Sequence, residues 1–147
     1  MPASGYGSTS SSCAIIRTYY STVESSALAY NAYHYWKNWP NYIGSDEEKG
    51  LAQFYDSGAL VMKTVQNSFL KNTLKIMDTL KIPYEEWDGE KIESKLEGFD
   101  LKCFAPARLY DDPKFGLPTG GKLKGGVYFP AAGYVSDPQL ATHNIQK

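Results

Sequence analysis

Cysteine, histidine and clustered charge are scarce in this sequence. Cys13 and Cys103 are its only cysteines, and it has two histidines. We therefore expect neither a disulfide framework nor a structural zinc site, and both thiols should stay reduced. The formal net charge is −1, and no run of lysine or arginine supplies the positive charge of a nucleic-acid surface. No apolar run could cross a bilayer and no secretory leader opens the chain, so we expect a cytoplasmic protein.

The composition is that of a folded chain rich in tyrosine. Of the 147 residues, 42% are hydrophobic and 21% are charged, a balance that supports one ordinary domain with a buried core. Aromatic residues reach 14%, and twelve of them are tyrosines. Tyrosine has an apolar ring and a hydroxyl that can stay in water, so it suits surfaces and pockets that are mostly apolar with one solvated end. The composition alone therefore fits a binding module as well as an enzyme.

Helix signals occur in four segments. Ser21-Thr22-Val23-Glu24 has the form of a capping box, with Ser21 as the cap. It predicts a helix that ends near Trp39, because Pro40 disfavours helix in the residue before it. Four residues at helical spacing share one face of this helix: Leu28, Ala32, Tyr35 and Trp39. Further helices are expected over 67–80, over 89–96 and from 137 onward, where an Asp-Pro pair supplies a cap and a first helical residue.

Extended structure is expected in short pieces between these helices. Residues 13–20 are apolar and β-branched, and residues 51–62 read as a hairpin bent at Asp56-Ser57-Gly58. Strands are also expected over 84–87, 127–129 and 134–135. Residues 105–126 are dense in proline and glycine and predict a long irregular connection. Residues 44–50 predict a polar turn, and the paired acids at 46–48, 85–86 and 111–112 are interpreted as solvated.

Arg17 is the first candidate for a functional side chain. It is one of only two arginines, and it stands between Ile15-Ile16 and Tyr19-Tyr20. A guanidinium in an apolar, aromatic setting can hold a carboxylate through two parallel hydrogen bonds. The alternative interpretation is an arginine whose stem packs on the protein while its charge stays in water.

A second candidate is the serine-rich loop at 7–12. Its hydroxyl and backbone N–H groups could cradle a phosphate or the polar edge of a cofactor, although such runs are also common as flexible linkers. No GxGxxG occurs. Gly116, Gly121 and Lys122 approach the spacing of a phosphate loop, but Leu123 stands where that motif needs serine or threonine. We interpret that segment as a plain loop.

Two segments together resemble the D-amino-acid-oxidase-like flavoproteins, especially their sarcosine and dimethylglycine oxidase or dehydrogenase branch. The first runs Gly-Ser-Thr-Ser-Ser-Ser-Cys-Ala-Ile-Ile-Arg-Thr-Tyr-Tyr over 7–20 and leads into a helix rich in Ala, Tyr and Trp. The second runs Gly-Val-Tyr-Phe-Pro-Ala-Ala-Gly-Tyr-Val-Ser-Asp-Pro over 126–138. Between them, residues 54–62 and 90–99 are similar to strands and a short helix of the family's substrate domain. The likeness follows the family's order along nearly the whole chain.

This resemblance implies an FAD-dependent enzyme that oxidises the C–N bond of a secondary or tertiary amino acid. Hydride would pass to the flavin, and water would hydrolyse the imine. By the resemblance, Arg17 and Tyr20 would bind the amino-acid substrate, and Ser10, Ser11 and Ser12 would line the flavin side of the pocket. Relatives often carry His or a second Arg in the loop, where this chain has Ser10 and Ala14. No residue is assigned a catalytic role.

The resemblance also implies the architecture: an α/β fold of the FAD/NAD(P)-binding type, in two domains, with a mixed-sheet substrate domain. Residues 1–44 would belong to the FAD-binding domain, 45–134 to the substrate-binding domain, and 135–147 to a helix returning to the first. The glycine-rich nucleotide motif would precede residue 1 and the last helix is still building at Lys147, so we interpret the chain as an internal fragment. Alone, it is expected to bind FAD poorly and to be inactive.

Two alternatives stay open. One is a non-enzymatic, Tyr-rich domain that binds small molecules or a protein. The other is one subunit of a split flavin oxidase, in which a partner chain supplies the missing Rossmann half. The split oxidase predicts a large exposed apolar face, whereas the binding domain predicts a closed core without one.

Overall fold

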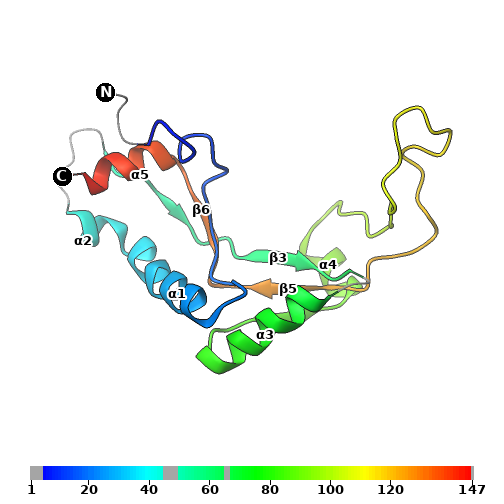
Figure 1. The fold of residues 1–147 in the computed structure, drawn as a ribbon, viewed down its shortest axis with the longest axis horizontal. Coiled ribbons are helices and arrows are strands. Elements are labelled where there is room, and N and C mark those ends of the chain that lie inside the picture. The colour runs from blue at the N-terminus through cyan, green and yellow to red at the C-terminus, as the bar shows by residue number, and fades with distance from the viewer. Residues whose placement is uncertain (1–4, 45–49, 65–66, 147) are drawn as a thin grey trace.

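The computed structural model describes residues 5–44, 50–64 and 67–146, so most of the polar turn expected over 44–50 lies outside the described residues. The described residues form a small mixed α/β fold with five helices and two three-stranded antiparallel sheets. The first sheet has the strand order β1-β6-β2 and the second β3-β5-β4. Figure 1 shows an elongated molecule, with the first sheet toward the end that holds both termini and the second sheet nearer the middle. The two-domain flavoprotein architecture stays a prediction.

One bent, two-stranded ribbon joins the two sheets. β2 (Phe54–Tyr55) and β3 (Ala59–Met62) form one side of it, and β5 (Gly126–Phe129) and β6 (Gly133–Val135) form the other. β2 pairs with β6 and β3 pairs with β5, so the expected hairpin within 51–62 is wrong. Residues 56–58 bend the chain without reversing it, and the Gly58 N–H donates to the Ala132 carbonyl across the ribbon at 2.8 Å.

The first sheet is covered on one face by helices. β1 (Ile15–Ile16) completes this sheet, and its helices are α1 (Val23–Lys37), α2 (Trp39–Ile43) and α5 (Pro138–Ile145). Trp39, Ala52, Val135 and Ala141 form the buried core between them. Buried Asn144 ties the layers together, because its side chain accepts from the Ala52 N–H at 3.0 Å and donates to the Gly50 carbonyl at 3.0 Å.

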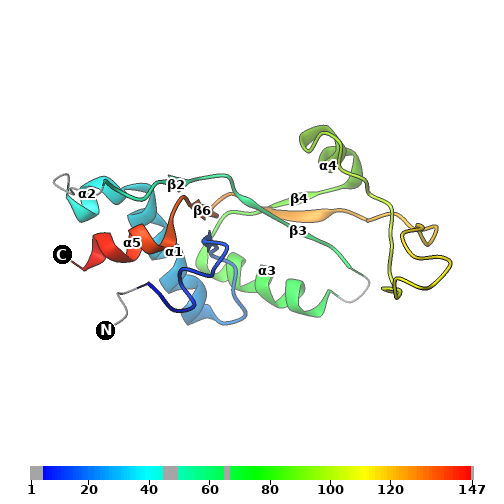
Figure 2. The same cartoon turned by 90° about the horizontal axis from the view of Figure 1, so that it is seen from above.

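The second sheet packs mainly on α3 (Ser68–Leu80). Val127 and Phe129 of β5 are fully buried with Met77 of α3. On the other face, β4 (Glu85–Trp87) and α4 (Gly89–Lys95) enclose a smaller core around Ile92. Figure 2 shows α3 and α4 on opposite sides of β3 and β4.

The mixed sheet expected for 45–134 is not observed in the described residues, where every strand pairing is antiparallel. The connection through α3 does make β3 and β4 run in the same direction, as a helical crossover allows. β5 then inserts between these two strands. It pairs with both of them and leaves no parallel neighbours.

Helix α1 departs from the sequence prediction in its cap and in its buried face. Thr22, not Ser21, caps it, and its hydroxyl accepts the Ser25 N–H at 3.3 Å. Leu28 is 72% exposed and Tyr35 is 47% exposed, whereas Ser26 and Tyr33 are buried. The periodicity located a helix, but of the residues expected to share one face only Trp39, which follows α1, is buried.

The other helix predictions agree closely with the structure. The helix expected over 67–80 is α3, and that expected over 89–96 is α4. Asp137 caps α5 as expected, accepting the N–H groups of Gln139 and Leu140. α1 ends at Lys37, close to the expected end. Trp39, which precedes Pro40, is nevertheless helical, because it begins the short helix α2. Among the described residues, no helix has the length and apolarity needed to cross a bilayer.

Candidate functional site

Arg17 lies just after β1 with its side chain exposed and resting on aromatic rings. Its guanidinium carbon is 4.8 Å from the centre of the Tyr20 ring and 5.6 Å from that of Tyr19. A guanidinium over a ring face is attracted by the ring's quadrupole. Within the described part of the chain, no carboxylate forms an ion pair with Arg17. The three residues Arg17, Tyr19 and Tyr20 are called the Arg17 platform below.

The backbone of the Arg17 platform is firmly anchored. Thr18 is fully buried, and its hydroxyl donates to the Ala131 carbonyl at 2.9 Å. The Tyr20 N–H donates to the hydroxyl of buried Ser26 at 3.1 Å. Because these bonds fix the residues on both sides of Tyr19, the exposed guanidinium is presented from a rigid segment.

Tyr19 connects the platform to the core of the second sheet. Its ring stacks on fully buried Phe129 with a centroid distance of 4.3 Å. Burial raises the pKa of the Tyr19 hydroxyl, and the neighbouring charge of Arg17 partly opposes that rise. The hydroxyl therefore stays protonated at neutral pH, and the positive charge of Arg17 is not neutralised by a phenolate.

An apolar face of the first sheet lies beside the platform. Register places Ile15 and Tyr55 on either side of Tyr134, and all three are exposed. The Tyr55 and Tyr134 rings stack with a centroid distance of 4.8 Å and an interplanar angle of 18°. Ile15 precedes Arg17 by two residues, so this face adjoins the platform along the chain. We call Ile15, Tyr55 and Tyr134 the tyrosine face.

The serine loop lies at the other end of β1. Ser10 donates its hydroxyl to the Gly7 carbonyl, and Ser12 accepts the Ala14 N–H. Ser11 is exposed and makes no hydrogen bond to another described residue. The structure brings Arg17 and Tyr20 together. No hydrogen bond or ring contact between described residues joins Ser10, Ser11 or Ser12 to either of them.

Sequence reasoning missed a polar cluster at the bend of the ribbon. Asp56 accepts the Tyr33 hydroxyl at 2.9 Å and forms a 2.9 Å ion pair with Lys37. Burial, and then the bond to Asp56, raise the pKa of Tyr33. The bond to Asp56 also raises the pKa of Lys37. Tyr33 and Lys37 stand four apart in a helix, but nothing in the sequence indicates that Asp56 would lie between them.

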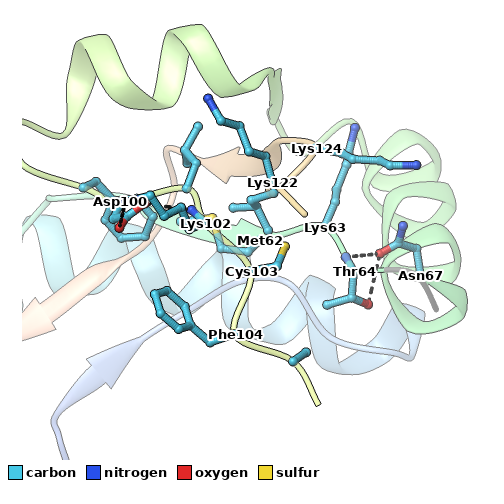
Figure 3. Close-up of a pocket in the computed structure, with 14 residues that line it drawn as sticks. Met62, Lys63, Thr64, Asn67, Asp100, Lys102, Cys103, Phe104, Lys122 and Lys124 are labelled. Carbon is cyan, nitrogen blue, oxygen red and sulfur yellow. Dashed lines mark hydrogen bonds and ion pairs between the residues drawn. The ribbon is translucent and has the colours of Figure 1, made fainter. Parts of the chain in front are cut away.

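Cavities in the described part of the chain lie away from Arg17, Tyr19 and Tyr20. One, of about 540 Å³, lies beside Trp39 and β2 and includes Tyr55 in its lining. Another, of about 580 Å³, lies at the far end of the second sheet and is shown in Figure 3. Among the described residues, no cluster of three or more His, Cys, Asp or Glu could hold a metal ion. The Arg17 platform lines none of these cavities and thus forms an open surface.

Comparison with protein-family models, with curated proteins and with solved structures finds no match to this chain.

Proposed function

We propose that this chain is part of an FAD-dependent oxidoreductase that oxidises the C–N bond of a secondary or tertiary amino acid. The observation that supports the proposal most is the Arg17 platform. An unpaired guanidinium, held by an anchored backbone beside an aromatic surface, suits the carboxylate of a small amino acid. The flat tyrosine face next to it would pack against the apolar part of the ligand or of the cofactor.

The residues proposed for the flavin fit it only in part. The N–H groups of Ser10 and Ser12 already donate to Gly5 and Thr9, so neither can serve a cofactor. Ser11 keeps its N–H and hydroxyl available and would hold the polar edge of the flavin. When bound, FAD would accept the hydride from the carbon beside the substrate nitrogen. Arg17 would bind the carboxylate and so orient that carbon.

The test is flavin reduction by N-methyl amino acids, measured on the longest open reading frame that encodes these residues. Arg17→Ala should raise the KM for sarcosine by roughly 10- to 100-fold, the effect of losing a charged hydrogen-bonded pair. Arg17→Lys should recover part of the affinity, because it keeps the charge but not the two-pronged geometry.

Arg108→Ala is the matched control, since Arg108 is the only other arginine and lies in the irregular segment. If Arg17→Ala and Arg108→Ala raise the KM equally, the carboxylate role is wrong. If the purified protein carries no flavin and gains none from added FAD, the oxidoreductase proposal is wrong.

The split-oxidase form of this proposal is favoured by one observation. Helix α1 presents Leu28 and Tyr35 to solvent, and Tyr42 of α2, which is 54% exposed, packs against Tyr35. An exposed apolar face of this kind is what a chain completed by a Rossmann half would present. The closed core expected of a small-molecule binding domain would not leave it open.

A further inference from the structure

The cavity at the far end of the second sheet combines an apolar lining with four lysines. It lies between the end of β3, the start of α3 and two irregular segments around residues 99–105 and 122–124. Met62, Phe99, Leu101, Phe104 and Leu123 supply apolar surface. Lys63, Lys102, Lys122 and Lys124 supply positive charge, and Asp100 is the only acid of the lining. Figure 3 shows Lys63, Lys122 and Lys124 on one side of Cys103, the Phe104 ring on the other, and Lys102 beside Asp100. We call this the lysine cavity.

Two of the four lysines are neutralised by neighbours and two are not. Lys63 pairs with Glu86, and Lys102 pairs with Asp100 at 3.3 Å. Lys122 and Lys124 form no ion pair with any described residue. The lining therefore carries an excess of positive charge beside apolar side chains.

The backbone places like charges opposite each other at this site. Lys102 and Lys122 face one another in an isolated antiparallel bridge, and like charges directly opposite are destabilising. Backbone hydrogen bonds hold the arrangement on both sides, because the Cys103 N–H donates to Gly121 and the Leu123 N–H donates to Leu101, each at 2.8 Å. Asp100, which pairs with Lys102, is the one acid of the lining beside these two lysines. A bound anion would add a second negative group there.

We propose that the lysine cavity binds a small amphiphilic anion, with an apolar or aromatic body and one carboxylate, sulfonate or phosphate group. The body would pack on Phe104 and the other apolar side chains. The anionic group would lie between Lys122 and Lys124, whose flexible side chains can both reach it. A volume of about 580 Å³ falls in the range of small-molecule sites. This site is separate from the Arg17 platform and does not depend on the proposed oxidoreductase activity.

The first test uses a matched pair of fluorescent probes on the whole chain. The anionic probe is 8-anilinonaphthalene-1-sulfonate, and the neutral one is N-phenyl-1-naphthylamine, which lacks the sulfonate. The double variant Lys122→Gln/Lys124→Gln should raise the Kd of the anionic probe about tenfold or more, since each charged contact contributes on the order of 1 kcal/mol. It should leave the neutral probe unchanged. The control variant Lys71→Gln/Lys75→Gln removes two exposed lysines outside the lining.

The second test locates the probe through the two free thiols. Cys103 lines the cavity, whereas Cys13 is exposed in the N-terminal segment. Saturating sulfonate probe should slow the alkylation of Cys103 by iodoacetamide several-fold and leave the rate at Cys13 unchanged, as followed by peptide mass spectrometry. The proposal is overturned if both double variants bind the anionic probe equally, or if Cys103 is no better protected than Cys13.

Discussion

Tyr33 and Asp56 fasten helix α1 to the bend of the ribbon, and their bond gives a prediction about alkaline pH. The pKa of Tyr33 is raised above its unfolded value near 10. Between the two values the folded chain holds a proton that the unfolded chain has lost. The free energy of unfolding should therefore fall as the pH rises above about 10. The raised pKa of Lys37 acts in the same direction.

Tyr33→Phe should lower the free energy of unfolding by about 1 kcal/mol at pH 7, the contribution of one hydrogen bond. The further fall of this free energy at alkaline pH should be smaller than in the wild type. Urea unfolding at pH 7, 9 and 11 measures both effects. Tyr35→Phe is the control, because Tyr35 is on the same helix but exposed, and its hydroxyl makes no hydrogen bond to a described residue. Identical pH profiles for the wild type and Tyr33→Phe would contradict the assignment.

The buried hydroxyl of Thr73 lowers the stability of the fold. Thr73 is fully buried in α3, and no described residue forms a hydrogen bond with its hydroxyl. An unpaired buried hydroxyl is unfavourable, and valine has nearly the same shape without it. Thr73→Val should raise the free energy of unfolding by about 1 kcal/mol. Thr79→Val should bring no such gain, because the Thr79 hydroxyl is exposed and donates to the Lys75 carbonyl at 2.8 Å. Thermal unfolding of both variants tests this prediction, which is wrong if the Tm of Thr73→Val rises no more than that of Thr79→Val.

At the scale of the element, the ribbon depends on a glycine where its strands meet. A Cβ on Gly133 would collide with the Tyr55 carbonyl and the Phe54 ring across the β2–β6 pair. Gly133→Ala should therefore destabilise the chain by about 2 kcal/mol or more, because the backbone atom in the way cannot move aside. Gly7→Ala is the matched control, since nothing lies within 4 Å of its Cβ. Equal unfolding midpoints in urea would show that the pairing is wrong.

Elements set by local signals were predictable, and elements set by distant partners were not. In α3 the apolar residues recur at helical spacing and Pro83 follows the helix, and α5 starts at an Asp-Pro pair. These signals act within a few residues, so both helices were located from the sequence. The pairing of β2 and β3 with residues 126–135 is decided some seventy residues away. The bend at Asp56 was therefore mistaken for a hairpin turn.

In the candidate site, too, local features were predictable and long-range contacts were not. The position of Arg17 after a short strand, and its neighbouring tyrosines, were visible in the sequence. Its anchoring was not, because Thr18 bonds to Ala131 and Ser26 bonds to Tyr20 only in the folded chain. The lysine cavity could not be predicted for a similar reason, since its lysines come from segments far apart in sequence.

At the scale of the whole molecule, residues 105–120 form a long loop that projects away from both sheets (Figure 1). Leu109 is 75% exposed and Tyr110 is 86% exposed. Trypsin should cut first at Arg108 or Lys114, because exposed loops are the preferred sites of cleavage. Denaturing gels timed against intact mass would locate the cut. A first cut inside α1 or α3 would contradict the fold.

The two pieces should stay together under native conditions. The C-terminal piece would carry β5 and β6, which are the central strands of the two sheets and are paired on both sides. Size-exclusion chromatography of the nicked chain should therefore give one peak. Arg108→Gln/Lys114→Gln should delay the first cut without changing the elution volume of the uncut chain.

The placement of β5 and β6 also has a consequence for synthesis on the ribosome. Both central strands lie within residues 126–135, after β1, β2, β3 and β4. A nascent chain grows from its N-terminus at roughly 5–20 residues per second. Neither sheet can start to assemble until those late residues have left the exit tunnel, and until then the four earlier strands have no partner. The pairing of β1, β2, β3 and β4 must therefore follow the synthesis of residues 126–135.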